Sequence, residues 1–152
     1  MKLTSPAFSD GDSIPRRYTC EGEDLSPPFV WDGIPAGTVS LLLACEDPDA
    51  PRRVFCHWVA FNIPPDLPGL EEDAASSAGK TFRQAVNDFG HPGYNGPCPP
   101  HGDRPHRYHF RLMALDRMIP DLSPSAKGAD VVAQARPYAT ASAGLIGTFA
   151  RG

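Results

Sequence analysis

The sequence has no long hydrophobic segment and no basic tract. Its longest apolar run, near Leu41–Cys45, is far shorter than the about 20 residues that a membrane-spanning helix needs. Residues 1–15 contain one lysine and no apolar core, so they do not resemble a signal peptide. No stretch of Lys and Arg is long enough to follow a nucleic-acid backbone, and the formal net charge is −4. We therefore expect a cytoplasmic protein that neither inserts stably into a membrane nor binds nucleic acid.

The motifs of metal sites and of common hydrolases are also missing. The cysteines form no CxxC pair, and Cys45 and Cys56 lie in apolar runs, which favours buried free thiols. There is no HExxH or GxSxG motif, and GKT at residues 79–81 lacks the earlier glycine of a phosphate-binding Walker loop. Cys98 is a weak candidate nucleophile, because prolines flank it and no oxyanion-hole motif accompanies it. We predict no metal and no cofactor.

Proline, in contrast, is abundant. The chain has 18 prolines in 152 residues, roughly 12% where about 5% is usual, and 14 glycines accompany them. This composition excludes a helical bundle and predicts short strands joined by shaped loops. The length is that of one domain, and we expect residues 1–152 to form a single one.

Three segments predict the main strands of a sheet. Thr38–Cys45 and Val54–Ile63 are apolar without alternation, which is typical of strands buried on both faces. Arg107–Leu115 alternates between apolar and polar residues, which predicts a strand with one buried face. The long irregular stretch at 64–105 separates the last two, and a loop of that length is usually functional.

The C-terminal region predicts one helix and one further strand. The SPS segment at residues 123–125 can cap a helix that runs to about Arg136, before Pro137. The segment GLIGTFA at 144–150 predicts a last strand. The expected fold is thus dominated by β-structure with few helices.

An acidic loop follows the first predicted strand. In the segment DPDAP the two prolines hold Asp47 and Asp49 rigidly, with their carboxylates on opposite sides. A polar turn that ends the strand is the alternative, but two prolines around two acids exceed what a turn needs. His57 follows in an apolar segment, where an imidazole must find a hydrogen-bond partner or stay neutral. We predict an Asp–His pair between this loop and His57, with a satisfied core histidine as the alternative.

A second group of polar residues precedes and begins the third strand. His106 and Tyr108 share a parity, so we expect both on the apolar side of the sheet, whereas His109 should be exposed. Gly96 lies in a proline-stiffened loop, where its backbone N–H can be offered to an anion. A ligand segment for SH3 or WW domains is the alternative for this loop, but such ligands usually lie in disordered tails.

These motifs resemble, in order, the signature segments of the phosphatidylethanolamine-binding proteins, also called Raf kinase inhibitor-like proteins. The matching segments are DPDAP, HWVAFNIP and NDFGHPGYNGPCPPHGDRPHRYHF, and the GPCPP form resembles the bacterial and archaeal branch. The resemblance implies a mainly β fold with a large central β-sheet, a smaller second sheet and a few peripheral helices. It also implies a small anion pocket at the sheet edge, where relatives bind phosphate-like groups such as the phosphoethanolamine head group.

Matched residue by residue, the resemblance also implies the ligand-binding positions. It allows a cis Ala50–Pro51 bond, and a homodimer, as in some relatives. Asn95 stands where relatives often have glycine, and the turn at 100–105 is more charged, so the loop shape and the choice of ligand can differ. The positions implied to bind the ligand are Asp47, Asp49, Pro51, His57, Gly96, Pro97, His106 and Tyr108.

This chemistry predicts a protein that binds a small anion or phosphorylated ligand, with a regulatory use and no catalysis. Protonated imidazoles donate charge-assisted hydrogen bonds to phosphate, and a nearby carboxylate raises the pKa of an imidazole and can accept from an amine. No residue is an obvious activated nucleophile. Two alternatives stay open: an Asp/His or metal-assisted hydrolase of a small ester or phosphoester, and an interaction module whose pocket loops bind a protein partner.

Overall fold

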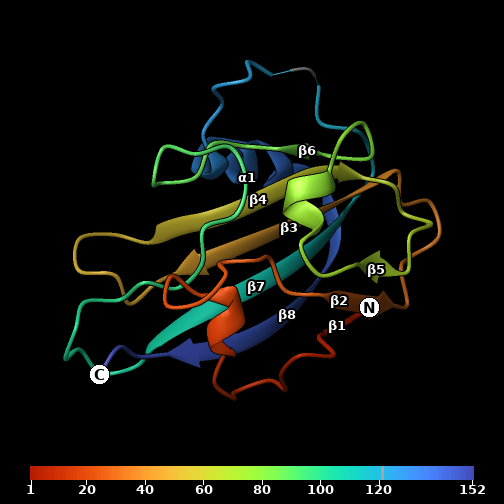
Figure 1. Cartoon of the computed structure of the whole chain (residues 1–152). Coiled ribbons are helices and arrows are strands. Elements are labelled where there is room, and N and C mark those ends of the chain that lie inside the picture. Colours follow the sequence, from red (N-terminus) through yellow and green to blue (C-terminus); the bar gives the residue numbers. More distant parts are fainter. Residues whose placement is uncertain (121) are drawn as a thin grey trace.

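Two antiparallel sheets pack against each other in the computed structural model, which describes residues 1–120 and 122–152 (Figure 1). The larger sheet has the order β6-β4-β3-β7-β8, and the smaller has the order β1-β2-β5. The strands of the larger sheet are β3 (Ser40–Asp47), β4 (Phe55–Ile63), β6 (Arg83–Gln84), β7 (His106–Leu115) and β8 (Ala139–Phe149). Those of the smaller sheet are β1 (Lys2–Thr4), β2 (Phe29–Asp32) and β5 (Gly69–Leu70). The helix α1 (Gly128–Ala135) and the 3-10 turns η1 (Arg16–Tyr18), η2 (Ala74–Ser77) and η3 (Arg136–Tyr138) complete the described elements.

Strands β3 and β4 are buried on both faces because each face has its own cover. Leu43 and Trp58 belong to a core cluster shared with the smaller sheet. Leu42 and Val59 belong to a second cluster on the other face, under α1 and its Val131. This double cover explains why neither strand shows an alternating pattern, as the sequence predicted.

The predicted mainly β fold with its three principal strands is confirmed, with small shifts of the strand ends. The predicted helix begins later than expected. The Ser123 hydroxyl accepts the backbone N–H of Ser125, which forms a turn instead of a helix cap. The helix starts at Gly128, which packs so closely on β4 that a Cβ there would lie 2.5 Å from Cys56 Sγ. The last strand begins at Ala139, earlier than expected.

The structure contains a disulfide that no motif in the sequence predicted. Cys20 and Cys98 form a disulfide across 78 positions of the sequence. Cys45 and Cys56 are buried free thiols, as predicted, and burial raises the pKa of Cys56 to about 12. A cis Ala50–Pro51 bond is not found: all peptide bonds of the described residues are trans, the lower-energy form even before proline.

No helix among residues 1–120 and 122–152 combines the length and the apolar character needed to cross a membrane.

Candidate ligand-binding site

Strand β3 ends, and β4 and β7 begin, at one end of the larger sheet (Figure 1). A cavity of about 180 Å³ is lined by residues from these strand ends and from nearby loops. Because neighbouring strands are antiparallel, these ends meet at one place although they are far apart in the sequence. The strands and the acidic loop contribute Asp47, Ala50, Pro51, Phe55, His57, His106 and Tyr108. The long loop before β7 contributes Phe89, Cys98, Pro99 and Pro100.

His106 is hydrogen bonded to a carboxylate through each of its ring nitrogens. Nδ1 lies 2.7 Å from Asp47 Oδ2, and Nε2 lies 2.9 Å from Asp103 Oδ2. The ring is 3% exposed. Burial alone would lower the pKa of His106, but the hydrogen bonds that it donates to Asp103 and Asp47 raise its pKa above the usual range. We therefore assign the protonated imidazolium, with both N–H groups donating.

His57 has the opposite electrostatic character. Its Nδ1 lies 2.7 Å from the Asn95 backbone carbonyl oxygen, and its ring is packed among Phe55, Phe89 and Tyr108. Burial lowers the pKa of His57, so the ring is neutral near pH 7. Because Nδ1 donates to a carbonyl, Nε2 of the neutral ring is an acceptor.

The predicted pair between the acidic loop and His57 is wrong, since Asp47 pairs with His106. The register of β3 on β4 shifts between Cys45 and Glu46, and His57 is the residue that the shift leaves without a partner. Such a bulge redirects a side chain, and here it turns His57 towards the Asn95 loop. His106 reaches Asp47 from the other neighbour of β3, strand β7.

Tyr108 contributes a buried hydroxyl without a partner. The residue is fully buried and lines the cavity, and no hydrogen-bonding partner of its Oη occurs among the described residues. Burial, and then the charge of Asp47, raise the pKa of Tyr108 well above its usual range, so the hydroxyl keeps its proton. It can donate a hydrogen bond to a group in the cavity.

The two carboxylates of the acidic loop point to different sides, as the sequence predicted. Asp47 Oδ1 accepts the backbone N–H of Asp49, and Asp47 also faces His106. The Asp49 carboxylate accepts three hydrogen bonds from Arg107: from the backbone N–H at 2.8 Å, from Nε at 3.0 Å and from Nη2 at 2.8 Å. These hydrogen bonds lower the pKa of Asp49 to about 2. Asp49 lines an adjoining open cavity of about 680 Å³, not the small one, whereas Pro51 and His106 line both.

Gly96 and Pro97 are not among the residues that line the cavity. The Gly96 N–H donates to Asp24 Oδ1 at 2.9 Å, and a Cβ on Gly96 would lie 2.1 Å from the Tyr18 carbonyl oxygen. Glycine is therefore required here for close packing against the N-terminal loop. Cys98 does line the cavity, but its sulfur is bonded to Cys20, so it is not the free thiol that a nucleophile needs.

Three side chains at the site were missed from the sequence. Asp103 contacts His106 and lies three positions before it in the sequence. This short spacing could have indicated the contact. Phe55 and Phe89 form an aromatic wall with ring centroids 4.8 Å apart, and Phe89 is half exposed.

His109 was expected to be exposed, but it is half-buried. Its Nε2 is inaccessible and without a partner in the described residues, because β8 and Glu46 flank it.

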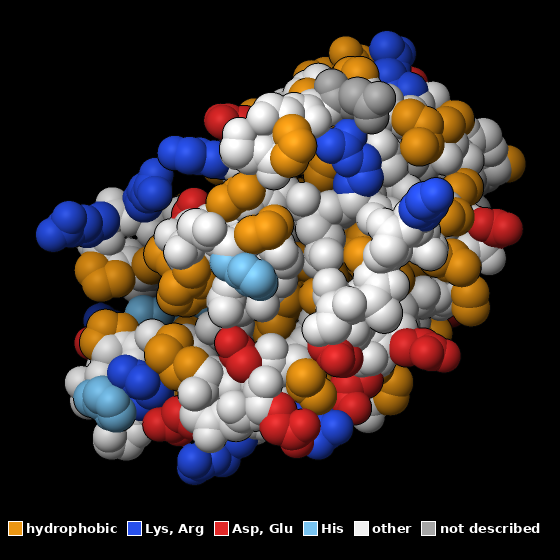
Figure 2. All heavy atoms as spheres, turned by 45° about the horizontal axis from the view of Figure 1, so that its top comes forward, with side chains coloured by type: hydrophobic (Ala, Val, Ile, Leu, Met, Phe, Trp, Pro, Cys, Tyr) orange, Lys and Arg blue, Asp and Glu red, His pale blue; other side chains and the backbone are white. Residues whose placement is uncertain are grey.

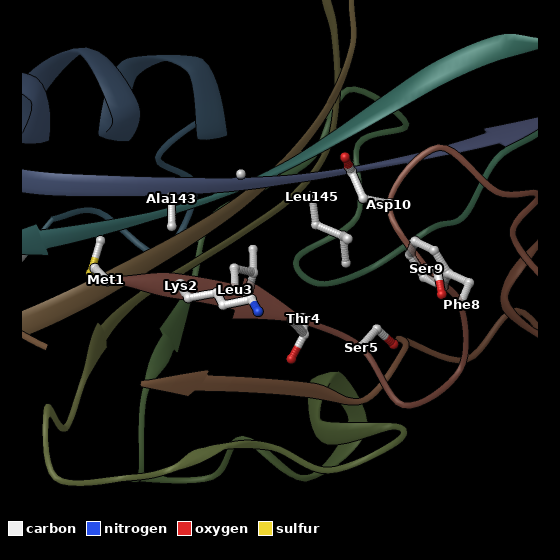
Figure 3. Close-up of a pocket in the computed structure, with 11 residues that line it drawn as sticks. Met1, Lys2, Leu3, Thr4, Ser5, Phe8, Ser9, Asp10, Ala143 and Leu145 are labelled. Carbon is white, nitrogen blue, oxygen red and sulfur yellow. The ribbon is translucent and has the colours of Figure 1, made fainter. Parts of the chain in front are cut away.

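The other surfaces offer less chemistry. Figure 2 shows one face on which Lys and Arg are dispersed among other side chains, without a continuous basic surface. Figure 3 shows a cavity of about 460 Å³ with Leu3 of β1 on one side and Leu145 of β8 on the other. Its one carboxylate, Asp10, already accepts the Ile146 N–H at 2.7 Å. No group of three or more metal-binding side chains occurs in residues 1–120 and 122–152.

The comparison with known proteins agrees with this fold. The family model described as phosphatidylethanolamine-binding protein matches residues 4–150. The chain belongs to this family. Its relatives in the family include a UPF0098 protein of Methanothermobacter thermautotrophicus, 50% identical over 100% of both chains. Another is a UPF0098 protein of Aquifex aeolicus, 41% identical over 99% of this chain and 89% of the relative.

Solved structures of phosphatidylethanolamine-binding protein homologues have the same fold. YbcL of E. coli, described as a member of the mammalian family, superposes with a TM-score of 0.93. It is 32% identical, over 99% of this chain and 98% of that one. The homologue CT736 of Chlamydia trachomatis superposes with a TM-score of 0.88 at 36% identity, over 99% and 97% of the two chains. The resemblance seen in the sequence motifs is thereby confirmed.

Proposed function

We propose that this phosphatidylethanolamine-binding protein family member binds a small anion or a phosphorylated ligand, such as phosphate or a phosphoethanolamine-like head group. The observation that carries the proposal is the Tyr108 hydroxyl, which is buried, without a partner in the described residues, and in the wall of a cavity lined by two histidines. Buried polar groups are nearly always hydrogen bonded, so an unpaired hydroxyl in a cavity points to a bound partner.

The remaining groups favour an anionic oxygen as that partner. The His106 imidazolium lies in the same wall, and its positive charge attracts an anion. The neutral His57 can donate from Nε2 when an approaching anion favours its protonated form. The volume of about 180 Å³ limits the buried part of the ligand to a small group, while the aromatic wall can contact what is attached to it.

The experiment is a titration with phosphate and with phosphoethanolamine, followed through the histidine side-chain NMR signals at about pH 6. We expect saturating shifts of His57 and His106 in the wild type. Tyr108→Phe, which removes only the hydroxyl, should weaken binding about threefold to tenfold, because the ligand then loses one hydrogen bond. The control His91→Ala replaces an exposed histidine away from the cavity and should bind as the wild type does.

Two results would contradict the proposal. One is the absence of shifts in the wild type. The other is equal binding by the wild type, Tyr108→Phe and His106→Ala. A hydrolase has one observation in its favour, the Asp47–His106 pair. It would be supported only by turnover of a small ester or phosphoester that Asp47→Asn abolishes.

The cellular setting and the partners are also proposals. A cytoplasmic location, a homodimer, the regulatory use and the absence of nucleic-acid and stable membrane partners stay predictions from the sequence. The Cys20–Cys98 bond weighs against a strongly reducing compartment, where such bonds are rare. A thiol titration of protein taken from its host would decide this point: four free thiols fit the cytoplasm, and two fit an oxidising compartment.

A further inference from the structure

We infer that Asp103 is a built-in competitor for the anion: its carboxylate holds the place on His106 Nε2 that the ligand must take. The inference rests on the proposed function and concerns the same site. It assigns a specificity role to a residue outside the ligand-binding positions that the family motifs imply.

The geometry distinguishes the two carboxylates that bind His106. Asp47 is fixed: it is 4% exposed and also accepts the Asp49 N–H. The Asp103 side chain is 48% exposed, and in the described residues its carboxylate has no hydrogen-bonding partner besides His106. Water reaches the Asp103 side of this pair and screens its charge, so the contact is easier to break than the buried contact with Asp47. Asp103 is therefore the carboxylate that an incoming anion can replace.

The position of Asp103 places it on the route to the buried nitrogen. Asp103 lines the larger open cavity of about 680 Å³, and His106 and Pro51 line both this cavity and the small one. Asp103 thus lies where the two cavities adjoin. Its loop begins at Pro100, in the wall of the small cavity, and turns at Gly102, whose φ is +81° and beside which a Cβ would meet open space. The Gly102 N–H donates to the Arg151 carbonyl oxygen at 3.2 Å, which holds the loop backbone, so the Asp103 side chain is the part that can rotate away from His106.

The charges explain how such a competitor selects ligands. With Asp103 in place, two carboxylates of charge −1 each surround one imidazolium of charge +1, so the group carries −1. An anion gains the His106 Nε2–H donor only after Asp103 leaves. A group with a double negative charge, such as phosphate or sulfate, competes better for the imidazolium than a monoanion such as acetate. The released carboxylate can then accept from the amine of a zwitterionic ligand.

The experiment compares Asp103→Ala with the wild type in a calorimetric titration with inorganic phosphate. We expect the variant to bind phosphate about threefold to tenfold more tightly, because a charge-assisted hydrogen bond no longer has to be broken. Asp66→Ala is the matched control, since it removes the same charge from an exposed residue that lines neither cavity. The control should bind as the wild type does.

A second measurement requires no ligand. Because the contact with Asp103 raises the pKa of His106, Asp103→Ala should lower that pKa in an NMR titration, and Asp66→Ala should not. An unchanged pKa would overturn the inference. Equal or weaker phosphate binding by Asp103→Ala, with binding by the wild type intact, would also overturn it and leave the proposed function standing. No phosphate binding by any of the three proteins would overturn the proposed function and the inference with it.

Discussion

At the scale of single residues, the two histidines of the cavity carry different charges at the same pH. His106 lies between two carboxylates, and its pKa is raised, whereas His57 is surrounded by aromatic rings and its pKa is lowered. The sequence predicts that both imidazoles can donate charge-assisted hydrogen bonds and that a nearby carboxylate raises the pKa of one of them, with the acidic loop paired to His57. In the structure His106 is protonated before a ligand binds, whereas His57 is neutral and gains a proton only when an anion binds.

This difference predicts how anion binding depends on pH. The usual pKa of histidine is 6.5, and that of His106 is raised, so the imidazolium is present at pH 6.5 and is lost as the pH rises through the higher value. Sulfate is a suitable probe because its charge stays constant, whereas phosphate groups change charge near about pH 6. We expect the sulfate affinity to fall by about tenfold or more between pH 6 and pH 9.

Asp103→Ala serves as the control for this assignment. In that variant the fall in sulfate affinity should begin at a lower pH, because one of the contacts that raise the pKa of His106 is missing. A sulfate affinity that is constant from pH 6 to pH 9 would contradict the assignment of His106 as the binding cation. The measurement is an isothermal titration at several pH values.

At the scale of elements, the strands could be predicted from the sequence, but the contacts between them could not. The apolar runs of β3 and β4 and the alternation of β7 identified three strands. The pairing of Asp47 with His106 depends on the sheet order, and the direction of His57 depends on a register shift. Neither leaves a local pattern in the sequence, because both arise from neighbours distant in the chain.

The sequence suggested that Gly96 offers its backbone N–H to an anion, and the contacts that decide otherwise again come from residues distant in the chain. Glycine allows a free N–H at an anion site, but it also allows backbone segments to approach closely. Two residues more than 70 positions earlier decide between these roles. Asp24 accepts the Gly96 N–H, and the Tyr18 carbonyl oxygen lies where a Cβ of residue 96 would be. The Cys20–Cys98 bond connects the same two loops and was likewise not visible in the spacing of the cysteines.

That connection predicts a loss of stability when the disulfide is removed. The bond closes a loop across 78 positions, and a native disulfide typically contributes about 2–4 kcal/mol to the free energy of unfolding. Replacing both Cys20 and Cys98 by alanine should lower the free energy of unfolding by this amount in urea denaturation. Reductant should lower the stability of the wild type to a similar extent and leave the double variant unchanged. Equal unfolding midpoints for oxidised and reduced wild type would contradict the prediction.

At the scale of the whole molecule, the larger sheet separates two hydrophobic clusters with different tasks. The cluster shared with the smaller sheet contains Tyr108, which also lines the small cavity. The cluster under α1 contains Val131 and Leu42 and includes none of the residues that line the small cavity. The helix side therefore packs on the sheet without contributing a residue to the wall of the small cavity.

This division predicts that the helix side can be weakened without loss of binding. Val131 is fully buried, so Val131→Ala should lower the free energy of unfolding by about 1–3 kcal/mol through lost packing. Its phosphate affinity should stay within about twofold of the wild type, because distant sites without shared contacts act independently. Tyr108→Phe should show the converse, with weaker phosphate binding at a smaller cost in stability. Urea denaturation and phosphate titration of the two variants measure both quantities. A large loss of affinity in Val131→Ala would mean that the sheet transmits changes from the helix side to the cavity.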